Sequence, residues 1–496
     1  MRFLQGRRLD AAFFHFFHSA QRAALLTALL VAAPGCTDGD LTVTFVDTHV
    51  TDRGEIQEPR GLTGLTVNAY TLDRDDGGLR KLDGHVSDEG VFTFVDVPKG
   101  DVHLHVKGQG SNEVIITSER ELDLGELTLG RPDARLATVP TAIALDIDGL
   151  SPWQDEDGLL TYALGSGTFG FLDDTLERPL SAGTTALTTT ADASLLQVPG
   201  VTESSRGDRV YMTQLVTRPF GEGEARRYWS VGKVYAPPSS FTLVEGATSA
   251  WSGTMADVPQ IPLHLDWRRA EFAALAAQVH PAAVVDRHSV FLTSQPAGER
   301  VAASVSPMLL WLDDPASEDA ALDLTYGNPY PSHWSAVGSV YTRFYVDLKV
   351  PDTGLTVRLD SLLSVSRHAR AMGTSALVPV VTPPRGLQID GMDAQITRRG
   401  VGASPKVSIA ETGASGALSY TYALYRLAPG STSMMLVGVV HTERTEIGLE
   451  LLGALQQGSW YQVRVTAQPR SDHAVNRRSV TWDGASADVI SGLFTP

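Results

Sequence analysis

Two groups of adjacent acidic residues are the first candidates for chemistry in this sequence. Asp155, Glu156 and Asp157 form one group, and Asp313 and Asp314 form the other. A glycosidase needs two carboxyl groups that face each other across a cleft, one as the acid and one as the base or nucleophile. Acidic runs in an acidic protein are more often loop charges than catalytic pairs. We therefore assign no catalytic residue and keep an exported hydrolase as the alternative function.

A glycine-rich segment is the second candidate. Residues 165–170 read Gly-Ser-Gly-Thr-Phe-Gly, which matches the spacing of a dinucleotide-binding loop. Such a loop must lead from a strand into a helix whose N-terminus meets the pyrophosphate. Here the chain continues as Phe-Leu-Asp-Asp, and no strand-helix-strand unit surrounds it. We predict a glycine-rich hairpin and no cofactor.

Three histidines are candidates for metal ligands. His103 and His105 are two residues apart and share one face of a strand, with His85 as a third candidate. Their apolar neighbours should take the buried face of that strand, namely Val102, Leu104 and Val106. Both histidines would then point into solvent, so we predict no metal site.

Two aromatic clusters are the candidate ligand contacts. Tyr326, Tyr330 and Trp334 lie in a long loop rich in proline and glycine, and Tyr228 and Trp229 form the second cluster. Aromatic rings of this kind stack on sugar rings or on peptides. The alternative is that they close the open end of a hydrophobic core.

Charge and cysteine content exclude several classes of function. The chain has a net charge of −17, and residues 1–35 carry +3, so the remainder would carry −20. Such a surface repels phosphate backbones, and the sequence has no basic stripe with interleaved aromatics, so we predict no nucleic-acid binding. The single cysteine excludes intramolecular disulfides and thiolate metal clusters.

That cysteine follows a segment typical of export signals. Four arginines lie within residues 1–22, and residues 23–33 form an uncharged apolar run. The run is too short to span a bilayer, which needs roughly 20 residues, but it fits the roughly 7–15 apolar residues of a secretory signal. It ends in Pro34, Gly35 and Cys36.

This segment resembles the lipobox of bacterial lipoproteins, in which apolar and small residues precede an obligatory cysteine. Ala33 and Gly35 fit that pattern, whereas Pro34 and the missing leucine depart from it. The resemblance implies a signal peptide over residues 1–35, a lipidated Cys36 and a linker up to residue 40. Several acyl chains on one residue hold a protein stably at a membrane. Thr37, in place of the aspartate typical of inner-membrane retention, favours the outer membrane or cell surface; plain secretion and an uncleaved anchor are the alternatives.

Residues 41–130 alternate apolar and polar side chains with the period of β-strands. Leu65, Val67 and Ala69 show this alternation. Glycine turns and paired aromatics then follow in order, at Gly84, Gly90, Phe92, Phe94, Val97, Pro98, Gly100, Val102 and Leu104. The string resembles the transthyretin-like fold of carboxypeptidase regulatory domains. The resemblance implies a non-catalytic β-sandwich that serves as a stalk, a spacer or a binding platform.

Residues 131–380 predict a larger central β domain with one helix. Segments rich in aromatic and β-branched residues recur between turns of proline, glycine, aspartate and serine. The helix is expected at residues 266–280, where Asp266 can cap the N-terminus and Phe272 and Val279 fall on one apolar stripe.

Residues 381–496 predict a third β unit. Val407 and Ile409 begin a further series of alternating segments. The stretch Gly-Ser-Trp-Tyr that ends at Tyr461 resembles the end of fibronectin type III domains, although Gln457 replaces the usual proline. The resemblance implies a seven-stranded sandwich in which Tyr461 bonds back to the corner backbone, with no chemistry of its own.

The fold class we predict is therefore all-β, with three tandem β-sandwich units. The leading hypothesis is a cell-envelope lipoprotein, held at the membrane by its lipid, that acts as a non-enzymatic binding or adhesion scaffold for a protein or glycan. The alternative is an exported hydrolase of glycan or peptide with a catalytic central domain and accessory sandwiches. A deep central cleft with two facing carboxylates would favour the hydrolase.

Overall fold

The fold is built almost wholly of β-strands. Strand accounts for 54% of the structure and helix for 6%, which confirms the predicted fold class. The computed structural model describes residues 39–72, 78–108, 110–221, 226–237, 239–296, 306–410, 418–470 and 484–496. The predicted signal segment and Cys36 lie outside them. Of the helices in these ranges, none is both long and apolar enough to cross a bilayer.

The N-terminal module, residues 41–130, contains a two-sheet sandwich. Its strands are β1 Leu41–Thr44, β2 Val46–Thr51, β3 Gly54–Pro59, β4 Thr66–Leu72, β5 Leu79–Lys81, β6 Gly84–Val86, β7 Phe92–Phe94, β8 Val102–Gly108, β9 Ser111–Thr117, β10 Glu121–Asp123 and β11 Leu127–Leu129. One sheet has the order β10-β1-β7-β6, and the other has the order β5-β4-β8-β9. Val67 and Ala69 face the core between the sheets, as do Val102, Leu104 and Val106, so the predicted alternation is confirmed.

The central module, residues 131–380, is a long antiparallel sheet with smaller sheets packed on it. Its strands are β12 Ala142–Asp148, β13 Gly158–Ala163, β14 Thr168–Phe171, β15 Ala186–Asp192, β16 Val210–Pro219, β17 Arg227–Tyr235, β18 Thr248–Thr254, β19 Ala256–Asp257, β20 Gln260–Trp267, β21 Val284–Gln295, β22 Met308–Asp314, β23 Ala320–Gly327, β24 Ser335–Lys349 and β25 Thr356–His368. The long sheet runs β14-β13-β16-β17-β22-β21-β24-β25. The sheet β15-β12-β18 packs Ile143 and Leu145 against Leu159 and Met212.

Short helices complete the central module. They are α2 Arg269–Ala273, α3 Ala276–Val279 and α4 Ala369–Met372, with 3-10 turns at Asp173–Thr175, Ala193–Leu195 and Ser204–Arg206. The continuous helix predicted at 266–280 is wrong. Asp266 and Trp267 belong to β20, where they pair with Ala321 and Ala320 of β23, and the indole of Trp267 is fully buried. Strand pairing with a distant segment thus outweighs the local helix propensity, and only two short helical turns follow.

The glycine-rich segment at 165–170 forms the predicted hairpin. It connects β13 and β14, which pair antiparallel from Leu160↔Phe171 to Ala163↔Thr168. Gly167 has a φ of +68°, and a Cβ atom there would lie 2.8 Å from the carbonyl oxygen of Leu129. Glycine is required because this turn packs against the backbone that leaves the N-terminal module.

The C-terminal module, residues 381–496, places one four-stranded sheet against another. Its strands are β26 Arg385–Ile389, β27 Met392–Asp393, β28 Arg398–Arg399, β29 Lys406–Ala410, β30 Leu418–Leu427, β31 Met434–Thr442, β32 Glu446–Gly448, β33 Tyr461–Pro469, β34 Ala485–Ile490 and β35 Phe494–Thr495, with a 3-10 turn at Glu450–Leu452. One sheet is β27-β26-β29-β32, and the other runs β31-β30-β33-β34. The Gln456 N–H donates to the Tyr461 hydroxyl at 2.8 Å, which confirms the predicted corner bond.

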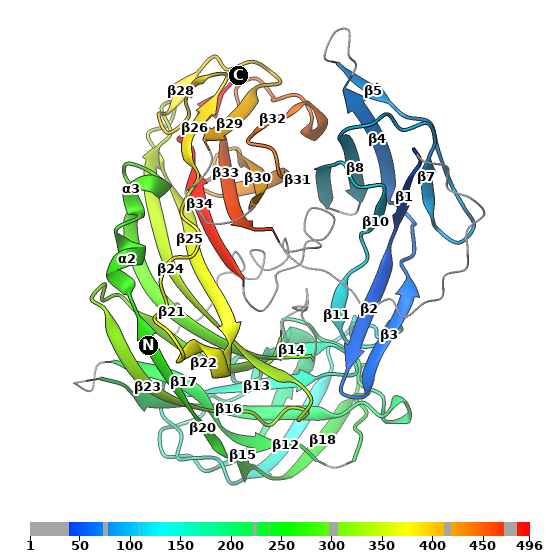
Figure 1. Cartoon of the computed structure of the whole chain (residues 1–496). Coiled ribbons are helices and arrows are strands. Elements are labelled where there is room, and N and C mark those ends of the chain that lie inside the picture. The colour runs from blue at the N-terminus through cyan, green and yellow to red at the C-terminus, as the bar shows by residue number, and fades with distance from the viewer. Residues whose placement is uncertain are drawn as a thin grey trace.

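One hydrogen-bonded sheet passes through all three modules (Figure 1). The last strand of the central module, β25, pairs with β34, and at the far side of that sheet β31 pairs in parallel with β9 of the N-terminal module. Arg444 also donates to Asp101 at 2.6 Å, and the Asn112 side chain donates to the Val437 carbonyl at 3.1 Å. We call the β9–β31 pairing with these two side-chain contacts the seam.

A second junction joins the N-terminal module to the central one. The carbonyl oxygen of Leu129, at the end of β11, lies against the turn at Gly167 of the central module. The tip of the β2–β3 hairpin places Arg53 against Gly207. The N-terminal module therefore contacts both other modules, as the blue strands in Figure 1 show.

Candidate functional site

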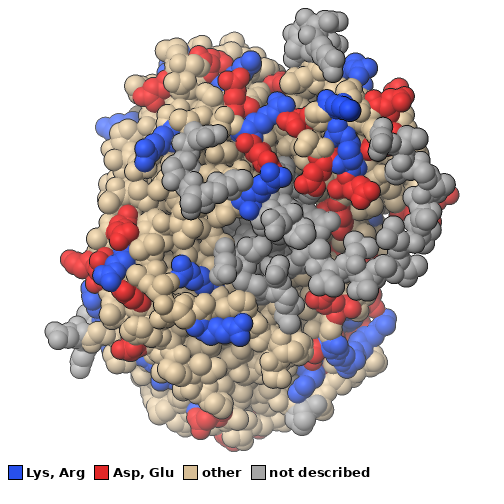
Figure 2. Space-filling model, viewed as in Figure 1, with Lys and Arg blue, Asp and Glu red and all other residues tan. Residues whose placement is uncertain are grey.

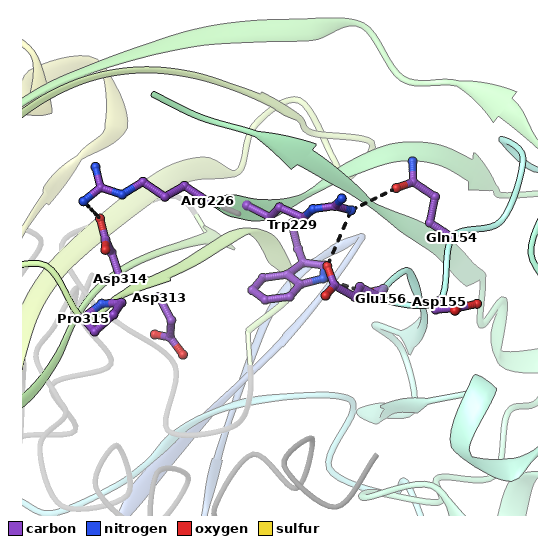
Figure 3. Close-up of a pocket in the computed structure, with 9 residues that line it drawn as sticks. Gln154, Asp155, Glu156, Arg226, Trp229, Asp313, Asp314 and Pro315 are labelled. Atoms are coloured by element: carbon purple, nitrogen blue, oxygen red, sulfur yellow. Dashed lines mark hydrogen bonds and ion pairs between the residues drawn. The ribbon is translucent and has the colours of Figure 1, made fainter. Parts of the chain in front are cut away.

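A pocket opens where β17 begins and β22 ends, in the central module (Figure 3). Its volume is about 570 Å³, within the range of roughly 300–1,000 Å³ typical of small-ligand sites. The residues that line it are Gln154, Asp155, Glu156, Arg226, Arg227, Trp229, Asp313, Asp314 and Pro315. The pocket thus unites members of the two acidic groups that lie far apart in the sequence.

Trp229 forms the aromatic wall of the pocket. It pairs across β17 and β22 with Trp311, and the two ring centroids are 5.1 Å apart at an interplanar angle of 31°. The indole Nε1 of Trp229 donates to the backbone oxygen of Glu156 at 2.7 Å. Ring packing and this hydrogen bond together fix the orientation of the indole before any ligand arrives.

The acidic group at residues 313–314 is tied into the protein by arginines. Asp314 is 2% exposed and accepts from the buried Arg269 at 2.7 Å, with Arg226 3.7 Å away. Burial lowers the pKa of Arg269, and the hydrogen bond to Asp314 opposes that effect. Asp313 accepts from the Ser289 hydroxyl and lies 3.4 Å from Arg287. Both carboxylates therefore have structural partners.

The other acidic group is divided between the pocket and the core. Asp157 is 1% exposed and accepts from the Thr217 N–H at 2.8 Å and from Gln214 at 3.1 Å, so it organises the turn before β13. Asp155 and Glu156 are exposed at the pocket, and Glu156 lies 3.8 Å from Arg227. Figure 3 shows the Trp229 ring between Asp313 on one side and Glu156 on the other.

Four of the five predicted ligand-contact aromatics lie in the core instead of on the surface. Tyr326, Tyr330 and Trp334 are each 5% exposed, and Tyr228 is 4% exposed. These four side chains are therefore not placed to contact a ligand, and their burial agrees with the other interpretation given above, that the aromatics close a core. Of the predicted set, Trp229 alone lines the pocket.

The buried aromatic side chains of this set are held by contacts with other aromatic rings and with the backbone. Tyr330 packs edge-on against Tyr162, with centroids 5.8 Å apart, and lies 5.2 Å from Tyr211. Tyr228 accepts a hydrogen bond from the Thr325 N–H at 3.1 Å. Burying these rings removes a large apolar area from water, which outweighs the polar composition of the loop.

The prediction that His103 and His105 both point into solvent is wrong for His103. His103 is 7% exposed, because the face of β8 that we expected to meet solvent lies near Arg444 of the C-terminal module. Burial first, and then Arg444, lower its pKa to about 4. His105 is partly exposed and bonds to Asn112 at 2.7 Å. Within the described ranges, no three His, Cys, Asp or Glu side chains are grouped so that they could hold a metal ion.

Sequence reasoning missed several members of the pocket. Arg226 and Gln154 were not predicted, and neither was Trp311, which does not line the pocket but packs against Trp229 and stands two residues before Asp313 on the same strand face. That spacing was a usable signal once β22 had been recognised as a strand. Arg226 and Gln154 carry no local signal, since only the fold brings their loops together.

Charges of both signs are interspersed over the described part of the molecule that Figure 2 presents. Charged side chains of the described residues form ion pairs, for example Arg358 with Asp347 at 3.0 Å and Arg343 with Asp360 at 2.9 Å. The combination of carboxylates and guanidinium groups at the pocket therefore resembles the rest of this surface.

The comparisons with known proteins add little. No protein-family model and no curated protein match the chain. Among solved structures, it is similar to the N-terminal four Ig domains of Dscam1 in isoforms 8.4, 1.9 and 6.9, with 9%, 9% and 8% identity. Each alignment covers 92% of this chain and 99% of the other, with a TM-score of 0.12. A likeness at this TM-score carries no argument about ligand or partner.

Proposed function

We propose that this protein is a lipid-anchored component of the bacterial cell envelope that serves as a non-enzymatic binding scaffold. The observation that carries the proposal is the unbroken sheet from the central module through the C-terminal module to the N-terminal module. Such a sheet holds three modules in fixed relation, which suits the display of a binding surface. The export signal and Cys36 supply the membrane address.

A hydrolase is the second candidate, and one observation favours it. The pocket gathers Asp155, Glu156, Asp313 and Asp314 around one aromatic ring, an arrangement that a glycosidase could use. Against it, both carboxylates of the 313–314 pair have hydrogen-bonding partners within the protein, whereas a general acid must offer an oxygen to the leaving group. The scaffold is therefore the better supported function.

The membrane address is tested by the variant Cys36→Ser in the native host. We expect the unaltered protein to be cut before Cys36 and to sediment with membranes, and the variant to keep its leader or leave the membrane fraction. Thr37→Ser, which leaves the thiol in place, is the control. A variant that is still processed and still sediments with membranes would show that lipidation of Cys36 is not the anchor.

The non-enzymatic character is tested with the purified full chain. It is incubated with glycans and peptides, and the products are analysed by mass spectrometry. We expect the substrates to be recovered intact. Cleavage that is lost in Asp155→Asn or Asp313→Asn would establish the hydrolase instead.

A further inference from the structure

We infer that the pocket at Trp229 binds a neutral glycan, with one pyranose ring stacked on the indole. This inference rests on the proposed scaffold function and names the ligand class for it. Three features carry it: the fixed aromatic wall, the balance of donors and acceptors on its rim, and the net charge of the lining residues.

The aromatic wall is suited to a sugar ring. A pyranose presents a face of C–H groups that pairs with the flat, electron-rich face of an indole, and Trp offers the largest such face. Trp229 is held by Trp311 at 5.1 Å and by the Glu156 carbonyl at 2.7 Å. A ligand that stacks on it therefore does not have to order a mobile side chain, which reduces the entropic cost of binding.

The rim offers both donors and acceptors in planar side chains. Arg226 and Gln154 bring N–H groups, and Asp155 and Glu156 bring carboxylate oxygens. The ion pair from Arg226 to Asp314 spans 3.7 Å, longer than a hydrogen bond, so it does not consume the directional donors of the guanidinium. A hydroxyl group both donates and accepts, so a polyhydroxylated ring can satisfy both kinds of partner at once.

Charged ligands fit the same rim less well. Four carboxylates and two guanidinium groups line the pocket, so an anionic ligand such as a phosphate would meet an excess of like charge. A cationic peptide would gain from the carboxylates and from the ring, but it would leave the arginine donors facing a like charge. A neutral glycan is repelled neither by the carboxylates nor by the guanidinium groups.

The test uses the purified full chain and three soluble probes, cellotetraose, chitotetraose and maltotetraose. Binding is measured by titration calorimetry and by the shift of tryptophan emission. At least one probe should bind, and Trp229→Ala should weaken it about fivefold or more, as expected for the loss of one aromatic stack. Trp229→Phe, which keeps a ring in the wall, should weaken it less.

Matched charge variants separate the rim from general surface charge. Asp155→Ala should weaken binding of the same probe severalfold. Asp323→Ala, which removes a carboxylate from an exposed position on β23, should leave it unchanged. Thermal unfolding of each variant shows whether the fold is retained, and Trp229→Phe keeps the test valid if Trp229→Ala fails to fold.

Several outcomes would overturn the inference. These are no binding of any probe up to about 10 mM, equal binding by the wild type and both Trp229 variants, or Trp229-dependent binding of a tetralysine peptide in place of the glycans. The proposed scaffold is judged separately. Probes that bind at Trp229 and are also cleaved would keep the glycan site but refute the non-enzymatic scaffold, whereas membrane sedimentation without glycan binding would keep the anchor and refute the site.

Discussion

Mild acid should weaken this protein at the seam between its N-terminal and C-terminal modules. Two buried histidines lie there: His103 on β8, next to β9, and His441 on β31, opposite Ile115 of β9. Burial lowers the pKa of each to about 4, and Arg444 adds to the effect at His103. The Nε2 atom of each ring is buried without a hydrogen-bond partner in the described structure.

The sign follows from proton uptake. In the unfolded chain these histidines take up a proton near their ordinary pKa of 6.5, whereas in the folded protein they stay neutral down to about pH 4. Between these values the unfolded state binds more protons, so the free energy of unfolding falls as the pH is lowered. The stability is fully present above pH 6.5 and is lost progressively toward pH 4.

The magnitude is large enough to measure. A pKa that falls from 6.5 to about 4 corresponds to roughly 3 kcal/mol for each histidine, at about 1.4 kcal/mol per pKa unit. The steepest slope that one histidine can impose is therefore about 1.4 kcal/mol per pH unit. His288, buried in the central core with its pKa lowered to about 4, contributes in the same direction.

The assay is urea unfolding of the full chain at several pH values from 7 to 4.5, compared with single variants. His103→Leu and His441→Asn should each flatten the slope between pH 6 and 4.5 by up to about 1.4 kcal/mol per pH unit. His85→Gln, an exposed position in the same module, is the control and should not change the slope. Hydrogen exchange should show β9 and β31 opening first as the pH falls. Slopes identical to the wild type in both seam variants would refute the reasoning, because carboxylates alone would then account for the acid sensitivity.

Two further predictions concern single contacts. Tyr461→Phe should lower the free energy of unfolding by about 1 kcal/mol, because the Gln456 N–H loses its acceptor at 2.8 Å, and an unchanged urea midpoint would contradict this. Arg269→Met should lower the free energy of unfolding by about 3 kcal/mol or more, because the Asp314 carboxylate is left buried without its closest partner, the Arg269 guanidinium at 2.7 Å. A thermal midpoint within 1 °C of the wild type would show that Arg226 replaces that partner.

The sequence predicted what depends on local pattern. Period-two alternation placed Val102, Leu104 and Val106 in the core correctly, because a strand with one buried face must alternate. The corner bond of Tyr461 was also correct, since it joins residues five apart in the chain. In each case the information lies within a few residues of the position concerned.

The errors all come from long-range contacts. The helix predicted from Asp266 fails because Trp267 pairs with a strand about fifty residues further along the chain. Tyr330 is buried because its ring packs against those of Tyr162 and Tyr211, which are both more than a hundred residues away along the chain. His103 is buried beside Arg444 of another module. No local pattern contains such partners.

The pocket also shows the difference between what local sequence and long-range contacts determine. Its acidic residues and Trp229 were recognisable one by one, but their meeting depends on β17 pairing with β22 and on the turn before β13. A single sequence could name the groups but not their distance, and distance decides whether two carboxylates form a catalytic pair or a polar rim.

The seam also determines how the proposed anchor would act on the pocket. Four residues separate Cys36 from Leu41, where β1 begins, and the five steps along the chain between them span at most about 18 Å. A protein lipidated at Cys36 would therefore hold its N-terminal module close to the membrane. Since that module contacts both others, through the β9–β31 pairing and through Arg53 against Gly207, the pocket would keep a fixed height and direction above the lipid instead of moving on a flexible tether. Weakening the seam by acid would leave the pocket held to the N-terminal module by the second junction alone, without removing the protein from the membrane.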